Sequence, residues 1–294
     1  MGSAKRERQK QGRQIRLEQA MAEQKRKQRW RSVRNVVLII VAIVVALLVT
    51  SRFFGNDDKT AVATNSTASI GSESDASTTT AVTTPTGFEF GTYPCPQADG
   101  SSPRTIDLSS APQNCIDPAK TYTATFDTSA GVVKVNLDTQ TTPGTTNNFV
   151  VLARYHYYDG TKIFRAASEI GIIQGGSPHN DTNTDQGPGY DLPDEGFDYA
   201  SLPGAATGQP TGGPYSYSAG DLVMARSSQA NGAGAQFFFG ATDAIANLNS
   251  QGVYVKFGKT TEGQDVLKAI LDSAGGDAVP KPEVTINTVT ISES

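Results

Sequence analysis

One arginine and two glutamines recur between apolar runs and glycine turns in the middle of the chain. Arg165 follows the expected strand 161–164, Gln174 ends the apolar run that begins at Ile172, and Gln236 opens an aromatic run. A guanidinium and amides beside apolar surface can bind and reshape a chain without breaking a covalent bond. A second interpretation stays open for Arg165, because a strand arginine also needs a partner and an acid could serve as a purely structural one.

Other chemistries find little support in the residue pattern. The two histidines, His156 and His179, lack the spacing of metal ligands, and no GxSxG elbow offers a serine nucleophile. Residues 181–185 resemble the first half of a calcium loop, but Gln186 replaces the required glycine and Leu192 the final glutamate. We interpret residues 181–185 as a surface loop, and we expect neither a metal ion nor a cofactor.

Charge divides the chain near residue 35. Residues 1–34 hold twelve Lys and Arg against three Glu, whereas the whole chain of 294 residues carries a net charge of -4. We interpret the basic tail as a topology signal that holds the cytoplasmic end of a membrane segment, rather than as a site for nucleic acid.

The segment 35–54 predicts a single transmembrane signal anchor that contacts membrane lipid. Its core, Val36–Val49, is uncharged, and Arg34 and Arg52 can snorkel at its ends to complete a span of roughly 20 residues. A cleaved secretory signal is the alternative, with 61–63 as a small-residue cleavage site. That site lies twelve residues beyond the apolar run, which favours the uncleaved anchor.

Residues 55–88 are rich in Ser, Thr and Ala and predict a flexible stalk, because such a tract cannot bury enough apolar surface to offset its chain entropy. Residues 89–118 form an N-terminal extension that contains the only cysteines, Cys95 and Cys115. Two cysteines outside the cytoplasm usually pair, so we predict a disulfide. Two buried free thiols are the alternative.

The remaining residues, 119–294, alternate apolar and polar positions in short segments. Residues 121–126 and 131–137 predict a β-hairpin, and further strands are expected at 161–164, 222–225, 236–240, 253–258 and 284–291. Helices are expected from Pro143 and over 262–271. Many short strands with two helices favour a mainly β, closed barrel capped at its ends.

Eight motifs in this order and spacing resemble the cyclophilin family over the span 121–291, in a membrane-anchored bacterial form. They are PGTTNNF at 143–149, YDGTKIFR at 158–165, QGG at 174–176, GPGY at 187–190, DEGF at 194–197, LVMA at 222–225, GAQFF at 234–238 and VKFGK at 255–259.

The resemblance implies an eight-stranded antiparallel barrel with two capping helices, and an activity that interconverts cis and trans peptide bonds before proline. By position, Arg165, Gln174 and Phe238 resemble the catalytic arginine, the glutamine that holds it and the floor of the proline pocket. The resemblance assigns substrate binding to Ile172, Ala225, Arg226, Gln236, Leu248 and Tyr254.

The chain departs from the family pattern at several positions. Phe164 stands where the family usually has histidine, and Gly171 where an aromatic wall residue is expected. The segments 165–174 and 225–236 are each one residue longer than usual. Asn247 is nearest to the tryptophan known for cyclosporin contact, so the resemblance leaves cyclosporin binding open.

From these residues we expect a membrane-bound, extracytoplasmic peptidyl-prolyl cis-trans isomerase whose partners are unfolded or exported proline-containing polypeptides. The alternative is a catalytically weak cyclophilin-like module that binds such chains as a scaffold. A third interpretation, a tether whose main partner binds residues 1–34, requires that deletion of the tail abolish function.

Overall fold

The computed structural model describes residues 88–294, so the tail 1–34, the segment 35–54 and all but the last residue of the stalk 55–88 lie outside the described residues. Residues 88–294 fold into a sheet of nine strands in the order β8-β3-β4-β6-β5-β7-β2-β1-β9. The strands are β1 (Tyr122–Thr128), β2 (Gly131–Leu137), β3 (Arg165–Ala167), β4 (Ile172–Gly175), β5 (Asp221–Arg226), β6 (Ala233–Gly240), β7 (Lys256–Glu262), β8 (Asp277–Ala278) and β9 (Ile286–Glu293).

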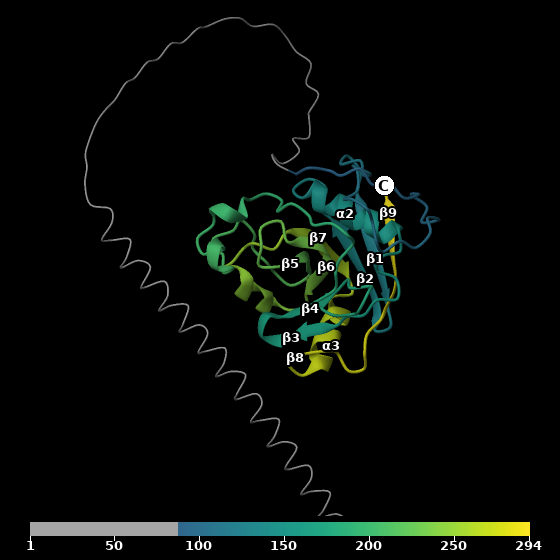
Figure 1. Cartoon of the computed structure of the whole chain (residues 1–294). Coiled ribbons are helices and arrows are strands. Elements are labelled where there is room, and N and C mark those ends of the chain that lie inside the picture. Colours follow the sequence, from purple (N-terminus) through teal and green to yellow (C-terminus); the bar gives the residue numbers. More distant parts are fainter. Residues whose placement is uncertain (1–87) are drawn as a thin grey trace, which may run out of the picture. The chain divides into compact units, whose positions relative to one another are not determined.

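Two α-helices, α2 (Pro143–Arg154) and α3 (Gln264–Ala274), lie at opposite ends of the sheet, as Figure 1 shows. Both were expected. Pro143 begins α2 because its fixed φ suits the first helical turn and its missing N–H is not needed there. The first N–H groups of α2 are bound instead by the buried carboxylate of Glu195, at 2.8 Å from Gly144 N and 2.7 Å from Thr145 N.

The expectation of a closed barrel with eight strands is wrong in its details. The ladder has nine strands and ends at β8 and β9, which do not pair with each other in the described residues. Pro280 and Pro282 follow β8 and have no N–H to donate, so the ladder cannot continue from β8 towards β9. Backbone hydrogen bonds between 160–163 and 284–286 connect the two sides of the gap locally.

Two predicted strands are shifted along the chain. Residues 161–164 form only an isolated bridge at Lys162, and the strand itself begins at Arg165. The strand expected at 253–258 is found at 256–262, where it pairs with both β2 and β5. The hairpin of β1 and β2 is confirmed, with Thr128 paired to Gly131 at its turn.

Aromatic rings fill the space between α2 and the sheet. Phe149 of α2 stacks on Tyr158 with ring centroids 5.0 Å apart, and Phe126 of β1 meets Phe239 of β6 at 5.1 Å. All four rings are buried almost completely. Burial of each such side chain contributes roughly 1.5–3 kcal/mol, so this cluster holds the strands that carry the pocket described below.

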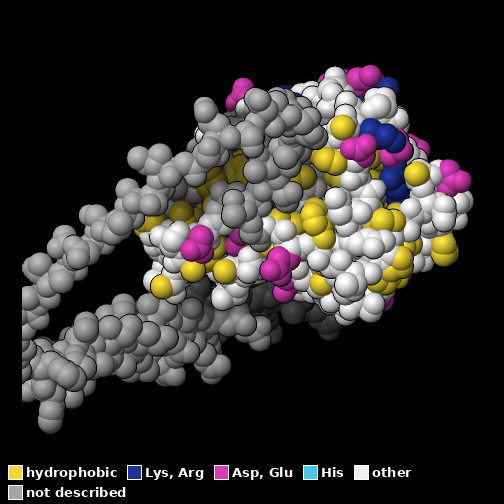
Figure 2. All heavy atoms as spheres, turned by 90° about the horizontal axis from the view of Figure 1, so that it is seen from above, with side chains coloured by type: hydrophobic (Ala, Val, Ile, Leu, Met, Phe, Trp, Pro, Cys, Tyr) yellow, Lys and Arg dark blue, Asp and Glu magenta, His cyan; other side chains and the backbone are white. Residues whose placement is uncertain are grey.

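The N-terminal extension is held by the predicted disulfide, which the structure confirms between Cys95 and Cys115. The extension also binds the domain directly, because Tyr155 donates its hydroxyl to the carbonyl of Pro94 at 3.0 Å. On the face shown in Figure 2, basic side chains lie next to acidic ones. Within residues 88–294, no helix is both long and apolar enough to cross a membrane.

Candidate active site

Arg165 and Gln174 face each other across the ladder of β3 and β4. The two residues are register partners, so their side chains emerge on the same face of the sheet. Arg165 Nη1 donates to Gln174 Oε1 at 3.2 Å. Arg165 and Gln174, which one short loop separates in the sequence, are therefore in direct contact in the structure.

A second amide extends this contact into β6. Gln174 Nε2 donates to Gln236 Oε1 at 3.0 Å, and Gln236 Nε2 donates to the backbone carbonyl of Thr182 at 3.4 Å. Each amide accepts on its oxygen and donates from its nitrogen, so the guanidinium at one end fixes the orientation of both glutamines.

Apolar side chains lie beside the guanidinium in the same cavity of about 530 Å³. Phe238 is only 3% exposed and packs edge-on against Tyr254, with ring centroids 5.6 Å apart. Ile172 of β4 and Leu248 of the 3-10 helix η4 (Asp243–Leu248) also line the cavity. The cavity thus joins the Arg165 guanidinium to a small apolar floor.

The cavity brings together all nine residues that the sequence assigned to a site. They are Arg165, Ile172, Gln174, Ala225, Arg226, Gln236, Phe238, Leu248 and Tyr254. The sequence reasoning missed the opposite wall, which is formed by residues of the loop 183–191, and it missed Ile170. Residues 181–185 were predicted only as a surface loop and residues 187–190 only as a family motif, because nothing in their composition shows that this segment folds back along β6.

Arg226 contributes to the cavity differently from a substrate-binding cation. Its side chain is only 4% exposed and forms an ion pair with Asp194, which is 2% exposed, at 3.1 Å. The guanidinium carbon also lies 4.1 Å from the centre of the Tyr199 ring. The charge of Arg226 is therefore neutralised by Asp194 within the protein. A bound polypeptide can contact mainly the backbone of Arg226.

Gly171 is explained by local geometry. It ends the short 3-10 helix η1 (Ser168–Ile170) with φ +63, in the left-handed region that favours glycine. A Cβ at this position would overlap Thr242 Oγ1, so a larger residue does not fit. Gly171 lies within the segment 165–174 that is longer than the family pattern, and its neighbour Ile170 lines the cavity.

Arg165 also has the acidic partner that the sequence left open. Asp277 of β8 accepts from Arg165 Nε at 2.9 Å and from Nη2 at 2.8 Å. These bonds hold the pKa of the Asp277 carboxyl below its ordinary value of 3.8. The structural and the functional interpretation of Arg165 are therefore compatible, because the arginine pairs with an acid and also lines the cavity.

The ion pair leaves the guanidinium available for a further contact. Among residues 88–294, Asp277 and Gln174 occupy three of its five N–H groups, which leaves two for a ligand. Arg165 is 35% exposed and Asp277 60%, so the pair adds little stability, on the order of 0–1 kcal/mol. Its main effect is to fix the plane of the guanidinium.

Removal of the ion pair between Arg165 and Asp277 gives the first prediction. In Asp277→Ala we expect catalytic efficiency, kcat/KM, to fall about tenfold, because the guanidinium loses one of its two supports and a misplaced group costs rate. The thermal midpoint should move little. Peptide isomerisation kinetics measure the effect.

Asp272→Ala is the matched control for this prediction, since Asp272 is an exposed acid whose one ion pair in the described part of the chain is with Lys268 on α3. It should leave kcat/KM unchanged. Unchanged kcat/KM in Asp277→Ala would show that Gln174 alone positions the arginine.

Within residues 88–294, no group of three or more His, Cys, Asp or Glu side chains could hold a metal ion. Asp181 and Asp185, from the half calcium loop, are used in other contacts: Asp181 accepts from the backbone N–H of Lys162, and Asp185 binds His179.

The chain is similar to known proteins in both sequence and fold. A family model described as cyclophilin type peptidyl-prolyl cis-trans isomerase/CLD matches residues 123–291. The chain is 30% identical over 176 residues to peptidyl-prolyl cis-trans isomerase cyp18 of Streptomyces antibioticus, covering 58% of this chain and 95% of that protein. It is 32% identical over 152 residues to peptidyl-prolyl cis-trans isomerase B of Bacillus subtilis, covering 52% and 90%. A solved structure of a Cryptosporidium parvum cyclophilin covers 59% of this chain and 99% of its own, with 24% identity and a TM-score of 0.47.

Proposed function

The chain belongs to the cyclophilin family and is a peptidyl-prolyl cis-trans isomerase, and from this premise we propose that it acts on X–Pro bonds of exported or cell-envelope polypeptides. The observation that carries the mechanism is the shared cavity of Arg165 and Phe238. A cation with free N–H groups and an apolar floor are the two parts that this reaction needs.

The chemistry consists of lowering a rotational barrier. Amide resonance gives the X–Pro bond a barrier of about 18–20 kcal/mol, while its two isomers differ by only about 0.5–1 kcal/mol. No bond has to be broken and no proton has to leave. An enzyme therefore needs only to bind the twisted bond better than either planar form.

The site residues contribute in different ways to binding the twisted X–Pro bond. Phe238, Ile172 and Leu248 hold the proline ring, and the backbone at Ala225 and Arg226, with Gln236, holds the residues that precede it. As the bond twists, the prolyl nitrogen loses conjugation and becomes a better acceptor. Arg165 then donates an N–H to that nitrogen, and this bond strengthens only in the twisted state.

The test is a peptide isomerisation assay on the purified chain, run beside a binding titration with the same peptide. An isomerase accelerates interconversion of the X–Pro bond, which takes tens of seconds uncatalysed. The alternative, a scaffold that binds proline-containing chains, gives saturable binding without acceleration, and that outcome would overturn the mechanism.

We further propose that residues 35–54 anchor the protein in the membrane, with the tail 1–34 in the cytoplasm and the catalytic domain outside it. The disulfide of Cys95 and Cys115 supports this placement, because disulfides persist in oxidising compartments. In host cells we expect the chain to remain with membranes after alkaline extraction and to be digested by protease added from outside. A chain in the soluble fraction, or one protected from external protease, would contradict the proposal.

A further inference from the structure

The N-terminal extension 89–118 lies outside the family match, which covers residues 123–291, and contacts one wall of the substrate cavity. We call residues 179–190 the groove loop. Leu108 of the extension donates its backbone N–H to the carbonyl of Pro188 at 2.8 Å. Gly189 lies so close to the Leu108 carbonyl that a Cβ there would overlap the oxygen. The extension and the groove loop are therefore in backbone contact.

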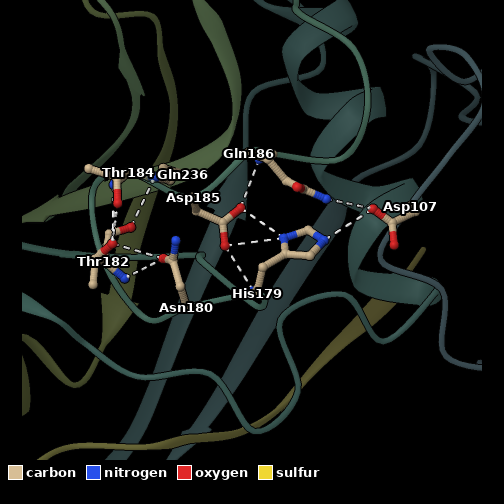
Figure 3. Close-up of polar contacts among 9 residues, drawn as sticks. Asp107, His179, Asn180, Thr182, Thr184, Asp185, Gln186 and Gln236 are labelled. Carbon is tan, nitrogen blue, oxygen red and sulfur yellow. Dashed lines mark hydrogen bonds and ion pairs between the residues drawn. The ribbon is translucent and has the colours of Figure 1, made fainter.

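Asp107 of the extension adds two side-chain contacts to the groove loop, as Figure 3 shows. One oxygen of Asp107 lies 3.1 Å from His179 Nε2 and accepts from Gln186 Nε2, also at 3.1 Å. The other ring nitrogen of His179 lies 3.0 Å from Asp185 Oδ1, and the side chain of Asp185 is fully buried. The imidazole thus links the extension to an acid inside the loop.

The groove loop connects in turn to the cavity. Asp185, Gln186, Pro188 and Tyr190 line it. The carbonyl of Thr182 accepts from Gln236, the residue at the end of the Arg165–Gln174–Gln236 series. This wall lies beside Gln236, on the side that the proposed function assigns to residues before the proline.

We propose that Asp107 is a positioning residue for the substrate groove: through His179 and Gln186 it fixes the groove loop against which the residues preceding the proline bind. The extension is then part of the site for long polypeptide substrates rather than a spacer. This inference rests on the proposed function, since it concerns how the same cavity binds its substrate.

The histidine carries a protonation requirement. Both partners of the His179 ring are carboxylates, which only accept, so both bonds form only when both ring nitrogens carry a proton. Burial lowers the pKa of His179, but the bonds to Asp185 and Asp107 outweigh it, so the pKa lies above 6.5. His156 repeats part of the arrangement, with Asp159 on one nitrogen and the carbonyl of Gly100, in the extension, on the other.

The experiment compares two peptides on the full, disulfide-intact chain. One has a single blocked residue before the proline and the other has four, and affinity is measured by titration calorimetry beside turnover. In Asp107→Ala we expect the affinity for the long peptide to fall about three- to tenfold, the worth of about one hydrogen bond, while the short peptide binds and turns over as before. Asp107→Glu should restore part of the loss.

Glu89→Gln is the matched control, because Glu89 is an exposed acid of the same extension with no polar contact in the described residues. An equal loss for both peptides, or no loss for either, would overturn the inference. Binding of the long peptide without any turnover in the wild type would instead refute the proposed function. The two failures are thus distinguishable.

The pH dependence provides a second readout. Two carboxylates contact the His179 ring, Asp107 from the extension and Asp185 from the loop. Tyr157, after α2, lies near both acids, and its pKa is raised by burial and further by these acids. Because the pKa of His179 is raised above 6.5, the doubly bonded form predominates at pH values below 6.5 and is lost as the pH rises through the folded-state pKa. We expect long-peptide affinity to fall about two- to threefold between about pH 5.5 and about pH 8.5. His179→Gln should remove this change, and its persistence there would exclude His179 as the source.

Discussion

Replacement of Arg165 by alanine is expected to lower kcat/KM for X–Pro peptides by about 100-fold or more, because one preorganised donor to a transition state is typically worth that much. The loss should appear in kcat rather than in KM, since the bond to the prolyl nitrogen strengthens only as the amide twists. The fold should survive, because Arg165 is 35% exposed and its ion pair with Asp277 lies at the surface. Single-turnover peptide kinetics measure the loss of rate, and a thermal melt tests whether the fold survives.

Two variants make this result specific. Lys268→Ala removes an exposed cation from α3, where Lys268 pairs with Asp272, and should leave kcat/KM unchanged. Arg165→Lys keeps a charge but loses the planar fork that Gln174 and Asp277 hold, so it should recover only a small part of the rate. Full activity in Arg165→Ala would mean that the cavity accelerates rotation by its shape alone.

The contact between Arg165 and Gln174 was predictable from local pattern, whereas the other site residues were assigned through the family resemblance. Arg165 and Gln174 lie on adjacent strands joined by one short loop, so a contact across the ladder follows from strand register. The hairpin of β1 and β2 was predictable for the same reason, because its alternation and its glycine turn are contiguous in the chain. The boundaries of β3 and β7 shifted because pairing with distant strands, not local composition, decides where a ladder begins and ends.

Asp277 and Asp107 were missed because their contacts join distant segments of the chain. Asp277 is 112 residues from Arg165, and an acid after two glycines gives no sign in the sequence that it will meet that arginine. Asp107 is 72 residues from His179, and the spacing of that histidine indicated only that it was no metal ligand. Composition cannot show that His179 joins the extension to the groove loop, with Asp107 on one ring nitrogen and Asp185 on the other.

The motif Asp194-Glu195-Gly196-Phe197 supported the family resemblance, and the structure gives it a physical reason. Asp194 neutralises buried Arg226 beneath the cavity, and the next residue, Glu195, binds the first N–H groups of α2. Gly196 has φ +84, in the left-handed region, and turns the chain directly after the two carboxylates. One short segment therefore ties β5, which carries the groove backbone, to the helix that covers the core.

The ion pair in that segment yields the second large prediction, which concerns stability. In Asp194→Ala we expect the free energy of unfolding to fall by about 3–5 kcal/mol, because the buried guanidinium of Arg226 keeps its desolvation cost and loses its charge partner. Asp194 also accepts from the backbone N–H of Asn231 at 2.8 Å, so the loop before β6 loses a contact as well. Denaturant unfolding followed by far-ultraviolet circular dichroism measures the change.

The double variant Asp194→Leu with Arg226→Met separates the cost of an unpaired charge from the cost of a lost contact. Replacement of both members by apolar residues of similar volume often recovers stability, since neither charge then has to be desolvated. The introduced thioether side chain can still lie against the Tyr199 ring, which the Arg226 guanidinium carbon approaches to 4.1 Å. We expect the double variant to be more stable than Asp194→Ala and to retain isomerase activity, because a bound chain meets Arg226 through its backbone. If the double variant folds well but has lost substrate affinity, the Arg226 side chain takes part in binding, and its assignment to the interior is wrong.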